Sequence, residues 1–382
     1  MLKTHAKRPL RVLHVLGSLN RGGVERWLIE LARHIDRRIV QFDFVVHGPQ
    51  TGVYETEIQE LGCNVFRCMP VSNPFLYSRR FLKLLRSHGP YDVVHSHVHN
   101  FSGLVMCLAK IGGVPGRVCH SHIDEAYLRP RWSSLRRLYA RGAQELIRRF
   151  ASSGIAVSGD AAADLFGPNW KLDHRWDVFP CAIDLRSYFH AVDRVTVRRA
   201  LSIPDNAFLI GHVGRFVPQK NHRFLIEVAE SLSRRRSEAI FMFVGDGPLR
   251  AEIEHAASKI GVDNVRFLGA RDDIPELLGA MDLFVFPSFF EGTPLAVIEA
   301  QASGLDCIVA NHLPEELEAV PQRVLRLPLQ VQLWTEKLCD FEIESDRRTA
   351  NREGAARILA AGNFDIGHSL DVLLQHYEQQ VN

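Results

Sequence analysis

Short apolar runs of strand length alternate with longer stretches of helical spacing through nearly the whole chain. Because strand, helix and strand in succession build a parallel sheet covered on both faces, this alternation predicts an α/β fold with doubly wound sheets. A polar, arginine-rich passage near residues 185–205 separates two such series, which predicts two Rossmann-like domains over residues 1–190 and 191–363. The expected strands are 10–16, 42–46, 64–68, 92–95, 117–119 and 154–157, then 208–213, 240–244, 265–268, 283–286 and 308–309.

Composition agrees with two domains, because 382 residues with 46% hydrophobic side chains can fill two cores. The basic N-terminus leads through a short apolar run directly into a glycine turn, and no apolar run has the length of a membrane span. We therefore expect a cytoplasmic protein. Seven scattered cysteines without a C-x-x-C pair predict reduced thiols, with neither a disulfide framework nor a zinc ribbon.

Residues 282–304, DLFVFPSFFEGTPLAVIEAQASG, place two glutamates around a strand-to-helix turn. The run 283–286 has the composition of a fully covered strand, and Thr293 is expected to cap a helix that begins at Pro294. Glu291 then lies beside the helix N-terminus, and Glu299 lies on the helix at the border of its apolar stripe.

This arrangement suits a phosphate with polar groups on either side of it. The unpaired N–H groups and the positive dipole end of a helix attract an anion, and Gly292 allows close approach to the backbone. The two carboxylates could then accept from hydroxyl groups of the same ligand. A solvated glutamate on the helix and an ordinary loop glutamate remain the alternative interpretation.

The stretch resembles the retaining nucleotide-sugar glycosyltransferases of family 4, whose signature is two glutamates separated by seven residues. The resemblance implies a GT-B fold, in which two Rossmann-like domains face a central cleft. It also implies that Glu291 holds hydroxyls of the donor sugar, that Glu299 holds the ribose, and that the turn between them binds diphosphate. The residues of this turn are Gly292, Thr293, Pro294 and Leu295. Asp306 departs from the family, which usually has proline there.

Other donor-binding loops follow strands of the second series. Gly214 and Arg215 end one strand, and Lys220 precedes the next helix. An arginine fork and a mobile lysine suit a diphosphate that gains charge, and the resemblance gives them that role; two solvated cations are the alternative. Loops at the carboxyl ends of parallel strands bind ligands, and the resemblance implies that the nucleotide base lies near Gly247 and Leu268.

The resemblance also assigns roles to both ends of the chain. Gly22 and Gly23 follow the first strand and open a helix, where the family's glycines border the donor, although a tight turn between strand and helix gives the same pattern. The C-terminal helix, residues 364–382, is expected to cross back onto the first domain.

Two groups of histidines alternate along expected strands, so each group should point to one face. They are His95, His97 and His99, then His120 and His122. The resemblance places one histidine against the donor sugar, and His120 and His122 are both candidates; for the first group we favour packing or hydrogen bonding. Because H-x-H is also a metal-ligand spacing, a metal-dependent hydrolase or deacetylase is an alternative function.

Charge divides unequally along the chain. Residues 1–190 hold 26 Lys and Arg against 16 Asp and Glu, or +10, and the remainder holds 20 against 28, or −8. Residues 129–150 carry seven arginines against one acid, interleaved with apolar residues. This composition fits peripheral contact with an anionic membrane at the inner face of the cytoplasmic membrane, or a helix packed on its own domain. The arginines of the expected membrane contact are Arg129, Arg131, Arg136, Arg137 and Arg141.

The sequence thus predicts a retaining glycosyltransferase that moves a sugar from a nucleotide-sugar donor to a glycan or lipid-linked acceptor in polysaccharide biosynthesis. Front-face attack, with the departing phosphate oxygen as the base, is the mechanism that the resemblance implies. We expect no divalent metal, since no D-x-D motif is present to bind one. We also expect no cofactor, because the nucleotide sugar is a substrate, and no nucleic-acid partner. An inactive GT-B binding subunit is a further alternative.

Overall fold

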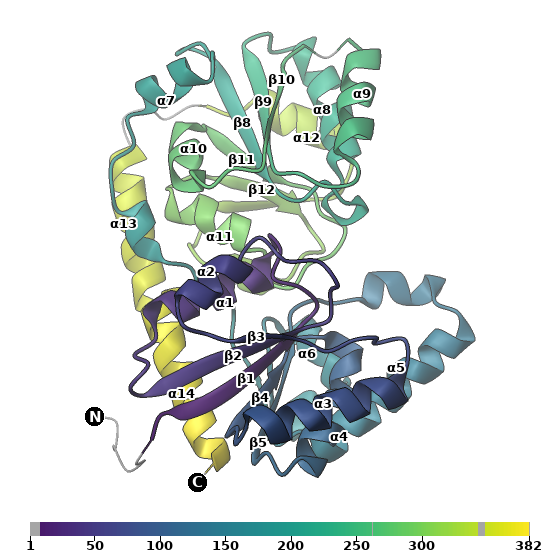
Figure 1. Cartoon of the computed structure of the whole chain (residues 1–382). Helices are drawn as coiled ribbons and strands as arrows, with labels where there is room; N and C mark the ends of the chain where they lie inside the picture. The colour runs from purple at the N-terminus through teal and green to yellow at the C-terminus, as the bar shows by residue number, and fades with distance from the viewer. Residues whose placement is uncertain (1–7, 262, 343–347, 382) are drawn as a thin grey trace. The chain divides into compact units, whose positions relative to one another are not determined.

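The computed structural model describes residues 8–261, 263–342 and 348–381. The chain forms two compact units (Figure 1). Unit 1 holds the chain up to Ala182 together with the C-terminal segment from Ile366, and unit 2 holds Ile183–Asp365. The units thus divide after Ala182, whereas the sequence placed the boundary at residue 190 and the return at residue 364.

Unit 1 contains a seven-stranded parallel sheet in the order β3-β2-β1-β4-β5-β6-β7. In β1, β4, β5 and β6 nearly every residue is buried, as a sheet covered on both faces requires. The strands are β1 Leu10–Leu16, β2 Val40–Val46, β3 Val65–Arg67, β4 Val93–Ser96, β5 Gly116–Ser121, β6 Ser153–Ala156 and β7 Trp176–Val178.

Helices cover both faces of this sheet (Figure 1). Helices α1 and α14 pack against each other on one face, and α3, α4 and α5 are successive neighbours on the other. The C-terminal helix therefore belongs to unit 1, as the resemblance implied. The helices are α1 Gly23–His34, α2 Glu55–Glu60, α3 Pro74–His88, α4 Ser102–Ile111, α5 Ser134–Phe150, α6 Gly159–Phe166 and α14 Ile366–Val381, with 3-10 turns η1 His99–Phe101, η2 Ala126–Arg131 and η3 Trp170–Leu172.

Unit 2 contains a six-stranded parallel sheet in the order β10-β9-β8-β11-β12-β13. Its strands are β8 Phe208–Val213, β9 Ala239–Val244, β10 Val265–Gly269, β11 Leu283–Phe286, β12 Cys307–Ala310 and β13 Val324–Leu327. Its helices are α7 Arg194–Ala200, α8 His222–Ser233, α9 Arg250–Lys259, α10 Ile274–Ala280, α11 Leu295–Ala302, α12 Val331–Cys339 and α13 Arg348–Ala361, with η4 Leu185–Tyr188, η5 Pro218–Lys220 and η6 Glu315–Leu317.

A buried ion pair anchors the centre of unit 2. The Asp282 carboxylate, just before β11, accepts from the Leu209 backbone N–H and from the Arg198 guanidinium, each at 2.7 Å. Arg198 is 1% exposed and also donates to the carbonyl oxygens of Ala207 and Ala280. This pair therefore ties α7 to β8 and β11.

The doubly wound architecture confirms the predicted fold class, and two strands were missed. Both β7 and β13 are edge strands, so each pairs with a neighbouring strand on one side only, and its sequence needs fewer apolar residues than that of a central strand. Within the described ranges, none of the helices combines the length and apolar character needed to cross a membrane.

Candidate functional site

Lys220 and Glu291 form an ion pair in unit 2, although the sequence suggested separate roles for them. The Lys220 Nζ lies 2.6 Å from Glu291 Oε1 and 4.6 Å from the centroid of the Phe286 ring. Glu291 is 8% exposed, and Lys220 stands at the end of η5. The structure therefore brings a cation and a carboxylate together between the carboxyl ends of β8 and β11.

Hydrogen bonds join the loop that follows β8 to the loop that follows β11. The Phe289 N–H donates to the Gln219 carbonyl oxygen at 2.9 Å, and the Gln219 side-chain amide donates to the Phe290 carbonyl oxygen at 2.7 Å. Asn221, in the left-handed conformation with φ 54°, donates through Nδ2 to the Pro287 carbonyl oxygen at 3.3 Å. Sequence reasoning missed Gln219 and Asn221, because their partners lie on a distant loop.

The helix after this turn starts one residue later than predicted. Thr293 is not the N-cap and Pro294 is not the first helical residue: Pro294 occupies the N-cap position with ψ 106°, and α11 begins at Leu295. The extended ψ of Pro294 is the reason, because a helical residue there needs a negative ψ. No side-chain cap bond occupies this end, so the first N–H groups of α11 are available to a ligand.

The loop that follows β9 is hydrogen-bonded to the loop that follows β8. The Phe216 N–H donates to the Asp246 carbonyl oxygen at 2.9 Å, and the Leu249 N–H donates to the Phe216 carbonyl oxygen at 3.0 Å. Gly247 has φ 156°, and a Cβ there would lie 2.6 Å from the Phe216 oxygen, so only glycine fits. Arg215 is exposed, and within the described ranges its guanidinium has no hydrogen-bond or ion-pair partner.

The other predicted donor residues of unit 2 fall on the same strand ends. Gly214 follows β8, and a Cβ there would lie 3.5 Å from the Lys220 side chain. Leu268 is half-buried near the end of β10, and Glu299 is 2% exposed on α11. A buried carboxylate and a free helix N-terminus therefore occur on one element.

The predicted glycines of unit 1 open α1. Gly22 is the N-cap residue of α1, with an extended backbone and no side-chain cap bond. A Cβ at Gly22 would lie 2.3 Å from the Glu25 carboxylate, whereas nothing lies within 4 Å of a Cβ at Gly23. Open space at this helix N-terminus is thus found at Gly23.

Five histidines of unit 1 gather on the face of the sheet that carries α1 and α14. His14 is the register partner of His95, so both side chains point to the same face, and His97 and His122 follow on the same side. His14 Nδ1 lies 3.0 Å from His97 Nε2, and His97 Nδ1 lies 2.8 Å from His122 Nε2. Sequence reasoning missed His14, which stands alone in its strand.

His99 does not belong to this group. It lies in η1 with φ 47°, and its Nε2 lies 2.9 Å from a carboxylate oxygen of Asp164 in α6. The left-handed backbone turns the side chain away from the direction that strand alternation would give. The expected set of His95, His97 and His99 is therefore wrong for its last member.

The two candidate donor histidines differ in exposure. His120 is 1% exposed, with its ring 5.2 Å from Trp27 and 3.8 Å from His122, whereas His122 is half-buried. Burial lowers the pKa of His122 to about 3 and holds the pKa of His120 well below its ordinary value. Both rings are therefore neutral at neutral pH, and His122 is the one that solvent reaches.

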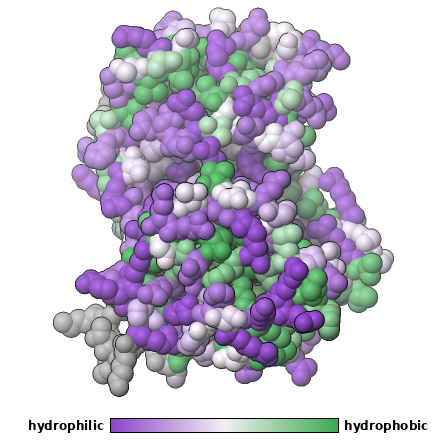
Figure 2. Space-filling model, in the orientation of Figure 1, coloured by the Kyte–Doolittle hydropathy of each residue, from purple (hydrophilic) through white to green (hydrophobic). Residues whose placement is uncertain are grey.

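Helix α5 of unit 1 exposes apolar side chains beside its arginines. Leu135, Leu138 and Tyr139 are 76%, 66% and 52% exposed. The buried face of α5 consists of Ala140, Ala143 and Ile147, and the helix packs against α4. Figure 2 shows hydrophobic surface among hydrophilic surface on the side of unit 1 where α5 lies.

The arginines near α5 are partly engaged with the domain itself. Arg129 pairs with the buried Asp164, Arg136 lies over the Trp132 ring at 4.3 Å, and Arg131 lies 5.3 Å from the Tyr127 ring. Arg137 donates to the Pro130 carbonyl oxygen, and Arg141 is exposed. Arg129 is thus part of an internal ion pair, and Arg136, Arg137 and Arg141 lie on the helix that carries the exposed apolar residues.

Two family models match the chain. Residues 21–187 match the model described as Glycosyltransferase Family 4, and residues 193–324 match the model described as Glycosyl transferases group 1. The two matches correspond to the two units.

Comparisons with individual proteins agree with these matches. A protein of Bacillus subtilis (strain 168) named "Putative glycosyltransferase EpsF" is 34% identical over 375 residues, which is 96% of each chain. An Escherichia coli UDP-Gal:alpha-D-GlcNAc-diphosphoundecaprenol alpha-1,3-galactosyltransferase is 30% identical over 234 residues, 60% of each chain. The crystal structure of Anabaena HepE in complex with UDP and glucose covers 97% of this chain and all of its own, with a TM-score of 0.78 and 21% identity.

Proposed function

This chain belongs to glycosyltransferase family 4 and has the GT-B fold, and on that premise we propose that it transfers a hexosyl group from a UDP-sugar to a lipid-linked acceptor with retention of configuration. The Lys220–Glu291 pair at the free N-terminus of α11 is the observation that supports this most. The names of the HepE complex and of the E. coli relative suggest UDP as the nucleotide and a diphosphate-linked glycan as the acceptor. Because the relatives are named glycosyltransferases, a metal-dependent hydrolase is not favoured.

The cations of unit 2 suit the diphosphate. Lys220 and the exposed Arg215 would neutralise charge that develops on the departing phosphate oxygen, and the N–H groups at Gly292 and Leu295 would bind its other oxygens. Fixed positive charge lowers the barrier because it stabilises the leaving group more than the intact donor. We propose that these groups serve in place of a divalent metal and that the reaction needs no cofactor.

Glu291 changes partner in this proposal. In the structure its carboxylate accepts from Lys220, at 2.6 Å. When the donor diphosphate attracts Lys220, the carboxylate becomes available to sugar hydroxyls, which fixes the anomeric carbon for front-face attack. In this proposal the ion pair holds the Lys220 ammonium and the Glu291 carboxylate in place before the donor binds.

The remaining donor contacts follow the family's assignments. We propose Glu299 for the ribose, Gly247 and Leu268 for the base, and Gly23 with its neighbour Gly22 as a border of the donor. Of the two histidines we propose His122 for the sugar, because His120 is enclosed by Trp27 and other rings of unit 1.

Ligand stabilisation tests the donor proposal. We expect UDP to raise the melting temperature more than GDP or ADP at equal concentration, because binding to the folded state stabilises it by mass action. UDP-hexoses should then be hydrolysed slowly without acceptor, and this hydrolysis should survive exhaustive chelation with EDTA. UDP binding without any turnover on a panel of UDP-sugars and lipid-linked acceptors would instead identify a binding subunit.

We also propose that α5 docks unit 1 on an anionic membrane, where a lipid-linked acceptor is found. Three exposed apolar side chains, Leu135, Leu138 and Tyr139, lie on one helix with Arg136 and Arg141. Apolar residues that enter the interface and arginines that face anionic headgroups are what such a helix needs, and each basic residue near the surface contributes ~1 kcal/mol.

Vesicle co-sedimentation tests this docking. We expect binding to vesicles with anionic lipid at low salt and little binding to neutral vesicles or at high salt. The double variant Arg136→Glu with Arg137→Glu should release the protein, whereas the matched control Arg234→Glu with Arg235→Glu, on exposed residues of unit 2, should not. Equal binding to neutral vesicles, or binding that both variants retain, would refute docking through α5.

A further inference from the structure

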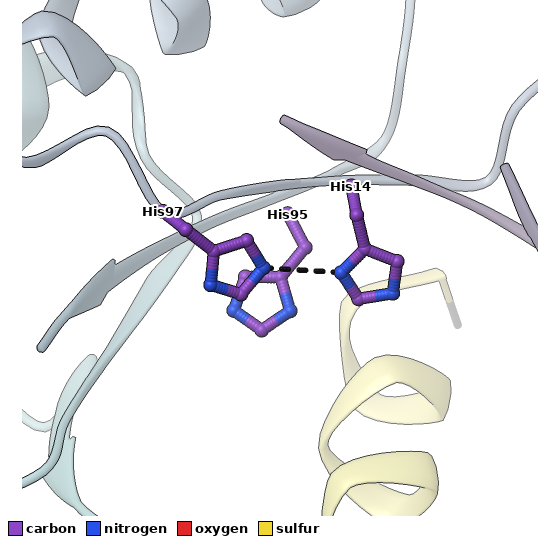
Figure 3. A group of neighbouring side chains, drawn as sticks. All are labelled: His14, His95 and His97. Atoms are coloured by element: carbon purple, nitrogen blue, oxygen red, sulfur yellow. Dashed lines mark hydrogen bonds between the residues drawn. The ribbon is translucent and has the colours of Figure 1, made fainter. Parts of the chain in front are cut away.

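The histidine cluster of unit 1 consists of two overlapping groups of three. One group is His14, His95 and His97, and the other is His97, His120 and His122. Within each group the nitrogen atoms that could bind an ion all lie within 4.8 Å of one another. Figure 3 shows the first group, with the hydrogen bond between His97 and His14 and the His95 ring beside it.

Packing alone does not account for this cluster. Neither ring nitrogen of the buried His120 has a hydrogen-bond partner within the described ranges, and the same holds for Nε2 of His14 and of His95. Phenylalanine would pack on Trp27 equally well without burying unsatisfied polar atoms, which are unfavourable in a protein interior. The unsatisfied nitrogens therefore indicate a ligand that accepts lone pairs.

We propose that His97, His120 and His122 bind one Zn²⁺ ion or a similar borderline transition-metal ion, in a state of the protein in which His122 does not contact the donor sugar. Imidazole nitrogen suits Zn²⁺, whereas Mg²⁺ and Mn²⁺, the usual partners of diphosphates, prefer oxygen ligands. The site lies wholly in unit 1, and the Lys220–Glu291 pair lies in unit 2.

Exposure favours this group over the other, because His14 and His95 are both fully buried, and two ligands of this group also have supporting hydrogen bonds. His97 Nε2 lies 3.0 Å from His14 Nδ1, and His122 Nδ1 lies 3.6 Å from Cys181 Sγ, so two ligands keep an outer partner when their other nitrogen binds the ion. Such outer partners orient metal-binding histidines in proteins generally. His97 and His122 are also half-buried, which gives the ion a route of entry and leaves a position for water.

The required rearrangement is small. Zn–N bonds of ~2.0–2.1 Å at tetrahedral angles separate the nitrogens by about 3.3 Å. His97 Nδ1 and His122 Nε2, now 2.8 Å apart, must therefore open slightly, and His120 must approach. Burial keeps the three imidazoles neutral, so their lone pairs are available at neutral pH.

Proton positions remain balanced when the ion binds. The proton now shared between His97 Nδ1 and His122 Nε2 belongs to one of these two rings, and that ring tautomerises, moving the proton to its outer nitrogen, when the ion binds. His97 then carries its proton on Nε2 and donates to His14 Nδ1, so the proton of His14 lies on its Nε2, and His122 carries its proton on Nδ1 and donates to Cys181. Each imidazole retains one proton, and none is released. Because His120 is in β5 and the other two ligands follow β4 and β5, the ion would link two strand ends of unit 1.

Metal titration of the stripped, full-length protein tests the site. We expect one equivalent of Zn²⁺ by competition with a chromophoric chelator, a higher melting temperature with Zn²⁺, and Co²⁺ absorption of tetrahedral intensity. His120→Phe keeps a ring against Trp27 and should weaken Zn²⁺ binding by more than about 100-fold, while Cys181→Ala should weaken it by about 10- to 100-fold. The matched control His255→Phe, on an exposed histidine of α9, should bind as the wild type does.

Two further variants keep the assignment falsifiable. His95→Gln should bind Zn²⁺ within about threefold of the wild type, because His95 is not a ligand here. If His95→Gln loses binding and His120→Phe retains it, the assigned ligands are wrong. Should His120→Phe fail to fold, judged by its metal-free melting curve, His122→Gln provides the same measurement. Wild-type protein that binds no stoichiometric Zn²⁺ overturns the proposal.

Discussion

Replacing Lys220 by methionine separates its charge from its packing. Methionine keeps an unbranched stem against the Phe286 ring, which lies 4.6 Å from the ammonium group, and removes the cation. The lost interaction forms with a leaving group that gains charge, and removal of one such donor typically costs 2.7–4 kcal/mol, or about 10²- to 10³-fold in kcat. We expect Lys220→Met to lower kcat by this factor.

Stability changes less than activity in this variant. The Lys220 and Glu291 side chains are 17% and 9% exposed, between a surface pair and a fully buried one. Breaking the pair should lower the free energy of unfolding by ~1–3 kcal/mol, since exposed pairs contribute ~0–1 kcal/mol and loss of one buried partner costs ~3–5 kcal/mol. Assays well below the melting temperature therefore measure the chemical defect.

The assay is UDP release from the UDP-sugar that the donor screen identifies. We expect kcat and kcat/KM to fall together, because the interaction strengthens in the transition state. The double variant Lys220→Met with Glu291→Gln should be less impaired than the product of the single defects, since the two groups act as a unit. Lys259→Met, on an exposed lysine of α9, is the control. Turnover by Lys220→Met at the wild-type rate would refute this reasoning.

Three further predictions follow from the geometry of unit 2. Glu299→Ala should lower the affinity for UDP, measured by calorimetry, at least about tenfold, whereas Glu291→Ala should leave this affinity near that of the wild type. Equal effects of the two variants would contradict the separate ribose and sugar roles. Arg198→Ala should lower the free energy of unfolding in urea by ~3–5 kcal/mol, against less than ~0.5 kcal/mol for the exposed Arg199→Ala, and a small effect at Arg198 would show that its ion pair is dispensable. Burial lowers the pKa of His222 to about 2, so below pH 6.5 only the unfolded chain gains this proton, and His222 contributes a loss of stability of ~1.4 kcal/mol for each unit by which the pH falls; His222→Phe should reduce the slope of stability against pH by about that amount, and an unchanged slope would exclude His222 as a contributor.

Local sequence was sufficient for the central strands. The predicted bounds of β1, β8 and β11 equal those observed, because each is an apolar run flanked by a turn. The edge strands β7 and β13 were missed, because β7 spans only three residues and an arginine interrupts the apolar run of β13. Edge strands form because a neighbouring strand offers hydrogen bonds, and the sequence of the edge itself carries little sign of this.

The glutamate spacing and the glycine turns predicted a candidate donor site from the sequence, and the roles of its residues stay predictions, because only the short turn before α11 relates Glu291 to Glu299 locally. The Lys220–Glu291 pair required the tertiary structure, since 71 residues separate its members and only the adjacency of β8 and β11 joins their loops. The histidine cluster shows the same division. Alternation predicted that His120 and His122 share a face, but His14 joined them only through its register with His95 across two strands. Spacing along one element is a local property of the backbone, whereas strand order and register depend on how the whole core packs.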